Sequence, residues 1–193
     1  MRQYTLKFVL AMMATLPALA FAHPEHEHTN SFLSGFSHPL GGLDHLLAMV
    51  AVGIWAVSLG GRAVWTVPTA FVATMLIGGG LAVAGVQLPF IEQGILLSVV
   101  FMGIMLLASV RMSISSCAAI VAAFALFHGA AHGLEMPLNA NGIQYAAGFA
   151  IATALLHATG VAFGAVVASI QAPIINRIAG SLIALAGAFL AFV

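Results

Sequence analysis

The chain has 193 residues, of which 62% are hydrophobic and only 5% are charged, and its formal net charge at pH 7 is zero. Soluble domains carry about 25% charged residues, so this chain has too few to cover a water-facing surface, and we expect an integral membrane protein. The balanced charge gives no indication of a nucleic-acid partner. The single cysteine, Cys117, excludes an intramolecular disulfide and a cysteine-based zinc site, and its apolar context predicts a packing residue.

Residues 1–22 have the pattern of a cleavable secretory signal peptide. Arg2 and Lys7 provide the positive start, an apolar core follows, and Ala20-Phe21-Ala22 fits the small-x-small rule for cleavage. The alternative is an uncleaved spanning helix, which the short apolar run and the polar sequence directly after it disfavour.

The segment after the predicted cleavage point, residues 23–37, is expected to be a periplasmic leader that opens with HPEHEH. Short histidine-rich tracts often bind metal, and a new amino-terminal histidine can chelate through its amine and its ring. A soluble, disordered leader without this role is the alternative, and the residues leave both open. The candidate ligands of the leader are His23, His26 and His28.

Residues 38–193 are predicted to form one all-α, polytopic domain with six transmembrane helices. Each apolar run is close to the roughly 20 residues that a helix needs to cross a bilayer. The expected spans are 39–59, 63–86, 93–110, 114–134, 143–169 and 173–193. With the mature amino terminus outside, Arg62, Arg111 and Arg177 all fall on the cytoplasmic side, in agreement with the positive-inside rule.

Polar residues stand at the start of the first predicted span, in the sequence HPLGGLDHLLAM. Pro39 suits a first helical turn, which puts His38 at the mouth of the helix and His45 on nearly the same face. Asp44 would lie about 100° around the helix from His45, within reach of a neighbouring helix. An Asp in a spanning segment needs a partner that compensates its charge. For Asp44 the alternatives are a metal ion, a bound proton, or a hydrogen bond to a histidine that holds two helices together. Met49 is more simply explained by packing than by metal binding.

The second group of polar residues is FHGAAHGLE, residues 127–135, at the end of the fourth predicted span. On a helix His128, His132 and Glu135 project from one face. Because the first span runs inward and the fourth outward, both groups are expected at one depth near the periplasmic surface. Imidazole and carboxylate ligands suit nickel, cobalt, zinc, copper and iron better than magnesium or calcium. The predicted metal ligands are His38, Asp44, His45, His128, His132 and Glu135.

His157 lies midway along the fifth predicted span, deeper than these ligands. It is interpreted either as a further station for an ion or a proton, or as a hydrogen-bonded structural histidine, and the sequence leaves both open. Apart from His157, no ionisable side chain continues a path through the inner half of the membrane.

The two polar groups together resemble the motifs of the HupE/UreJ family. They read His-x5-Asp-His, from His38 to His45, and Phe-His-Gly-x-Ala-His-Gly-x-Glu, from Phe127 to Glu135, with no departure in either. The resemblance covers nearly the whole chain. It implies a secondary permease for nickel or cobalt in the bacterial inner membrane, with a periplasmic amino terminus and a link to hydrogenase or urease maturation. It also implies that the motif histidines, Asp44 and Glu135 recognise and pass the metal.

We therefore expect transport of a metal dication without ATP, since the chain has no Gly-x4-Gly-Lys-Ser/Thr loop. The ion is cargo, no cofactor is expected, and the expected partners are the ion and the lipid bilayer, with a homo-oligomer left open. His38 and Glu135 would receive the ion, and the other four ligands would form the selective site. The alternatives are an intramembrane zinc hydrolase with Asp44 or Glu135 as base, although His-Glu-x-x-His is absent, and an accessory protein that holds metal without transport.

Overall fold

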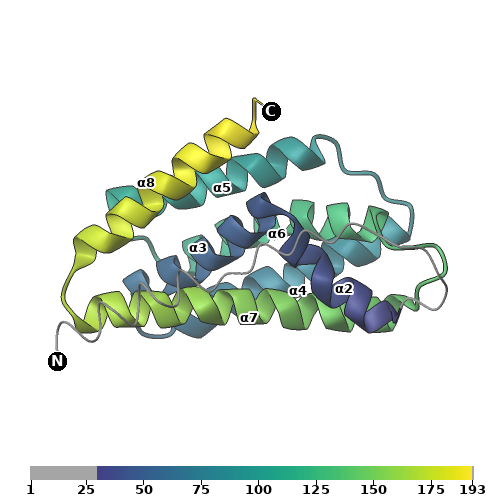
Figure 1. Ribbon diagram of the computed structural model, residues 1–193, viewed down its shortest axis with the longest axis horizontal. Coiled ribbons are helices and arrows are strands. Elements are labelled where there is room, and N and C mark those ends of the chain that lie inside the picture. The colour runs from purple at the N-terminus through teal and green to yellow at the C-terminus, as the bar shows by residue number, and fades with distance from the viewer. Residues whose placement is uncertain (1–29, 193) are drawn as a thin grey trace.

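The computed structural model describes residues 30–192, and every regular element in this range is an α-helix. The predicted signal peptide and the candidate ligands His23, His26 and His28 lie outside the described residues. The helices are α2 (Ser31–Gly41), α3 (Leu43–Leu59), α4 (Ala63–Val83), α5 (Ile91–Ala108), α6 (Ile114–Leu134), α7 (Gly142–Ser169) and α8 (Pro173–Leu190), as labelled in Figure 1.

The helices from α4 to α8 are each long and apolar enough to cross a membrane, and α2 with α3 make a sixth candidate if the bent pair counts as one span. The prediction of an all-helical, multi-pass membrane protein is therefore confirmed, and the number of candidate spans is five or six. Large apolar side chains point outward, and Trp65, Leu97 and Leu185 are each more than half exposed. Such a surface is stable against hydrocarbon and unfavourable in water.

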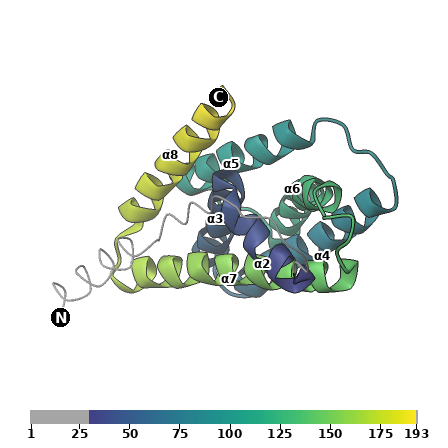
Figure 2. The same cartoon turned by 45° about the vertical axis from the view of Figure 1, so that its right-hand side comes forward.

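The first helix begins earlier than the sequence predicts. Helix α2 starts at Ser31, where the side chain of Asn30 caps it by accepting the backbone N–H groups of Phe32 and Leu33. Pro39 lies inside this helix, so the prediction that it occupies a first turn is wrong. At Gly42 the backbone is extended, and α2 and α3 meet at an angle of 84°. Figure 2 shows this change of direction.

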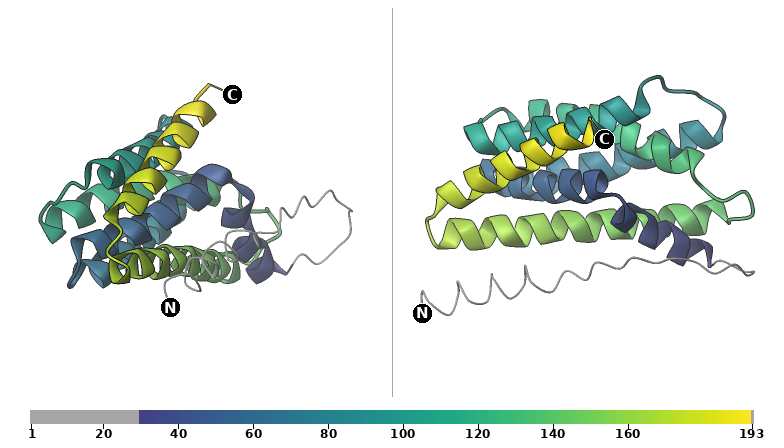
Figure 3. Two further views of the ribbon diagram at one scale, coloured as in Figure 1. Left: turned by 60° about the vertical axis from the view of Figure 1, so that its left-hand side comes forward. Right: turned by 45° about the horizontal axis from the view of Figure 1, so that its top comes forward.

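Helices α2 and α3 both pack along α7, while α4 packs on α6 and α5 packs on α8 (Figures 1 and 3). Glycines lie where these helices approach each other most closely. A Cβ atom on Gly53 of α3 would collide with the carbonyl oxygen of His157 in α7, and one on Gly129 of α6 would collide with that of Met75 in α4. Small residues at such positions let helices pack closely where lipid provides no hydrophobic drive.

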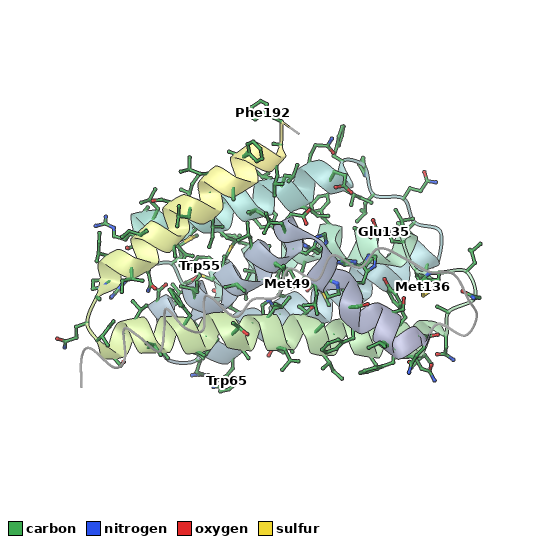
Figure 4. All side chains as sticks on the ribbon, in the orientation of Figure 1. Met49, Trp55, Trp65, Glu135, Met136 and Phe192 are labelled. Atoms are coloured by element: carbon green, nitrogen blue, oxygen red, sulfur yellow. The ribbon has the colours of Figure 1, made fainter. Side chains whose placement is uncertain are left out.

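Acidic and basic groups lie at opposite ends of the bundle. Gly133 near the end of α6 approaches Gly79 near the end of α4, so these two helices are parallel. Glu135 directly follows α6, and Arg62 directly precedes α4, at the other end. Figure 4 shows Glu135 toward one end, with Met49 and Trp55 successively further along the bundle. The polar motifs therefore share the end that is distant from Arg62.

Candidate metal centre

Helix α6 contributes two buried imidazoles to this end of the bundle. His128 is fully buried and His132 is 3% exposed. The ring of His132 packs against Phe149 of α7, with ring centroids 4.0 Å apart. The helix ends where Glu135 serves as its C-cap residue and donates its backbone N–H to Ala131. The last two turns of α6 and its C-cap residue thus place two imidazoles inside the bundle and a carboxylate at its rim.

The bend at Gly42 brings two further histidines to the same place. His38, near the end of α2, has its ring centroid 4.7 Å from that of His132, and His45, in the first turn of α3, has its centroid 4.4 Å from it. His45 also lies 4.8 Å from His128. The prediction that His38 and His45 share one helix face is wrong, because they belong to segments that point in different directions. Together His38, His45, His128 and His132 form what we call the histidine cluster.

Glu135 completes a three-ligand group at the rim of the histidine cluster. Its Oε2 atom lies 2.8 Å from His38 Nε2 and 3.8 Å from His132 Nδ1. One ligand atom from each of these three residues lies within 4.8 Å of the others. The His38 and Glu135 side chains are 32% and 53% exposed, while that of His132 is buried. A metal ion bound here would take the place of the hydrogen bond between His38 and Glu135, and two of its three ligands are open to the exposed side.

Asp44 orients the imidazole of His45. Its Oδ1 atom accepts the backbone N–H of His45 at 2.8 Å and lies 2.9 Å from His45 Nδ1. The hydrogen bonds of this carboxylate are therefore within its own helix, to the residue that follows it. Because a carboxylate only accepts hydrogen bonds, Nδ1 carries the proton and Nε2 keeps its lone pair. This carboxylate–histidine pair is the arrangement that orients metal-binding imidazoles in proteins.

Gly42 leaves the space that the Asp44 carboxylate occupies. A Cβ atom at this position would lie 2.7 Å from Asp44 Oδ1 and 3.1 Å from His45 Nδ1. The residue at which the chain bends thus also leaves room for the Asp44–His45 pair. The second glycine of the first motif thus has a structural reason that its sequence spacing does not reveal, whereas a Cβ atom on Gly41 would meet nothing within 4 Å.

Ser98 of α5 orients His128 in the same way, and sequence reasoning missed it. Its hydroxyl donates to the carbonyl oxygen of Ile95 at 2.6 Å and lies 2.9 Å from His128 Nε2. A serine hydroxyl has one proton, so toward His128 it acts as acceptor and Nε2 carries the imidazole proton. The lone pair of His128 is then on Nδ1. No sequence pattern distinguishes Ser98 from other small polar residues in a spanning helix.

In each of these two pairs, the second ring nitrogen of the histidine keeps a free lone pair. This nitrogen has no hydrogen-bond partner in the described part of the chain. The two nitrogens are His45 Nε2 and His128 Nδ1, and neither nitrogen of His132 has a hydrogen bond within residues 30–192. An unsatisfied buried polar atom costs about 1–3 kcal/mol, and hydrocarbon offers it nothing. These buried lone pairs belong to rings that pack against one another, and they are available to bind a cation.

Three other residues considered from the sequence lie outside the cluster. Met49 and Cys117 are fully buried in the apolar core, which agrees with the packing interpretation of both. His157 is buried in α7, and the ring of Phe71 of α4 contacts both it and His128. Phe71 therefore joins the cluster to His157, a contact that no sequence pattern indicates.

Comparison with known proteins agrees with the motifs. The family described as HupE / UreJ protein matches residues 10–190 of the chain. The protein called Protein HupE from Rhizobium leguminosarum bv. viciae is 44% identical to the chain over 181 residues, which is 94% of each sequence. No solved structure matches the chain significantly.

Proposed function

Because this chain belongs to the HupE/UreJ family, we propose that it is a secondary permease that carries Ni²⁺, or Co²⁺, from the periplasm to the cytoplasm across the bacterial inner membrane. The observation that carries this proposal is the convergence of four imidazoles and two carboxylates at one end of an apolar bundle. The described residues provide no hydrogen-bond donor for the free lone pairs of these buried imidazoles. The motifs of the family supply all six groups.

The donor set favours a late first-row dication. Imidazole nitrogen with a minority of carboxylate oxygen suits nickel and cobalt better than magnesium or calcium, which prefer oxygen ligands. Glu135 and Asp44 would offset the two positive charges of the ion as it loses its water. A permease site must bind tightly enough to select and weakly enough to release its ion, and neutral histidines with few charges satisfy both demands.

The ion would pass from the exposed side of the cluster to its buried side. His38 and Glu135 are the partly exposed groups and would receive it, His132 would share it, and His45 with His128 would hold it deeper in the bundle. The leader with His23, His26 and His28 would concentrate ion at this mouth. With the amino terminus in the periplasm, a membrane potential drives import by about 2.3 kcal/mol per charge per 100 mV, or about 4.6 kcal/mol for a dication.

The test is uptake of radiolabelled Ni²⁺ into proteoliposomes that contain the purified protein, a potential negative inside and no ATP. We expect saturable uptake that the potential accelerates. His132→Ala and Asp44→Ala should each reduce it by at least about tenfold, since even outer partners of metal ligands change affinity by about 10–100-fold. Cys117→Ala removes another potential ligand that is buried away from the cluster, and it should transport like the wild type.

Three results would contradict the proposal in different ways. Uptake that neither His132→Ala nor Asp44→Ala reduces would exclude the cluster as the transport site. Binding of Ni²⁺ without any uptake would favour the accessory role. Hydrolysis of a lipid ester or amide that depends on Zn²⁺ and on Glu135 would favour the hydrolase.

A further inference from the structure

A fifth described imidazole lies on the inner side of the histidine cluster. His157 is fifteen residues into α7, which is about 22 Å along the helix axis. Its side chain is buried, with 2% exposure, and neither ring nitrogen has a hydrogen-bond partner within residues 30–192. His128 is six residues from the end of α6, about 9 Å along that helix. His157 is therefore the deeper of the two.

A structural histidine would be expected to form hydrogen bonds, and His157 forms none within this range. Most buried polar side chains are paired, and leaving one unpaired is unfavourable by about 1–3 kcal/mol. A leucine at this position would fill similar space without that loss. The position thus carries a polar group whose partner is a ligand rather than the fold.

One aromatic ring connects His157 to the cluster. The ring of Phe71 in α4 lies 5.4 Å from that of His128 and 5.1 Å from that of His157, measured between centroids. The two imidazoles are therefore no further apart than the sum of these distances. Phe71 is only 1% exposed, so its ring contacts both imidazoles inside the bundle.

A buried thioether lies close to these residues. Met75 is one turn from Phe71 on α4, and its sulfur accepts a hydrogen bond from Thr153 Oγ1 at 3.6 Å. Thr153 is one turn from His157 on α7, and both Met75 and Thr153 are fully buried. Met75 and His132 also line one cavity of about 240 Å³ between α4, α6 and α7. Soft sulfur and imidazole ligands favour late transition-metal ions over magnesium or calcium.

We propose that His157 is a second ion-binding station, which receives the metal ion from His128 along Phe71 and beside the Met75 sulfur. This inference rests on the proposed transport function and extends the path beyond the family motifs. The first station includes the partly exposed His38 and Glu135, which water reaches, and the second holds the ion at a side chain that is buried. Two stations in series let the ion leave the first without returning to water.

The experiment uses the fact that Cys117 is the single cysteine of the chain. In a Cys117→Ala background, His157→Cys makes position 157 the only thiol. Purified protein is titrated with Co²⁺, whose d–d bands report the histidine cluster and whose thiolate charge-transfer band reports a cobalt–sulfur bond. Leu155→Cys is the matched control, because Leu155 is on the same helix but is 53% exposed on the outer surface.

We expect the thiolate band in His157→Cys and not in Leu155→Cys. Co²⁺ that binds the cluster of His157→Cys with the d–d bands of the background protein, but without a thiolate band, would overturn the proposal. His157→Leu should keep Co²⁺ binding at the cluster within about twofold and lose at least about tenfold in uptake rate, the lower limit for loss of a metal partner. Wild-type uptake in His157→Leu would equally overturn it.

The controls separate this proposal from the transport function itself. If the background protein binds no Co²⁺ and transports no Ni²⁺, the proposed function fails, and the second station fails with it. If the background protein transports Ni²⁺, but His157→Cys shows no thiolate band and His157→Leu transports like the wild type, the second station alone fails. A misfolded His157→Leu would lose the d–d bands of the cluster, and the cysteine variant then decides the question.

Discussion

The hydrogen bond between Ser98 and His128 gives the sharpest test of how the site is built. In Ser98→Ala, His128 Nε2 loses the group that lies 2.9 Å away and that assigns the proton to this nitrogen. Both tautomers of the ring then become accessible, and the ring itself is less well held. Loss of a partner behind a metal-binding histidine reduces affinity by about 10–100-fold, which corresponds to about 1.4–2.7 kcal/mol.

The assay is calorimetric titration of the purified protein with Ni²⁺ and Co²⁺, together with the KM for uptake. Ser58→Ala is the matched control, because the Ser58 hydroxyl donates to the carbonyl oxygen of Trp55 at 2.7 Å, three residues back, just as Ser98 does to Ile95. Ser58 makes no hydrogen bond to a histidine in the described chain. An affinity of Ser98→Ala within twofold of wild type, or an equal loss in Ser58→Ala, would refute the assignment of the His128 tautomer.

Three further substitutions test the geometry. Gly42→Ala should lower Ni²⁺ affinity about tenfold with little change in thermal stability, because its methyl group would displace the Asp44 carboxylate; calorimetry that shows unchanged affinity would contradict this. Gly129→Ala should destabilise the protein by about 1–3 kcal/mol in thermal unfolding, whereas Gly80→Ala, which meets no atom within 4 Å, should not. Glu135→Gln keeps the side-chain shape but removes the charge at the rim, so the KM for uptake should rise about tenfold, or ~1.4 kcal/mol, and an unchanged KM would exclude a role in receiving the ion.

The bend at Gly42 explains why the sequence correctly predicted that His38 and His45 lie near His132, although the helix geometry it assumed was wrong. A continuous helix from Pro39 would have placed His38 and His45 on one face, with Asp44 turned away from them. Instead α2 begins at Ser31, and the chain bends by 84°. Both histidines still contact His132, because they lie close to the bend on either side of it. Local periodicity contains no information about such a bend.

The sequence by itself determined that the chain crosses a bilayer several times and which spans carry polar groups. Hydropathy and span length are local properties, and a bilayer accepts little else than apolar helices of a given length. The two histidine motifs are likewise short segments that can be recognised without a structure.

Only the tertiary structure decided which atoms face each other. Ser98 contacts His128 across 30 residues, His38 contacts Glu135 across 97, and Phe71 joins His128 to His157 from a third helix. These contacts depend on the packing of α3 to α7 and on close approaches at glycines that have no local signature. Residue types along a span therefore indicate a metal site, whereas the lone pairs that are free to bind the metal depend on contacts between helices.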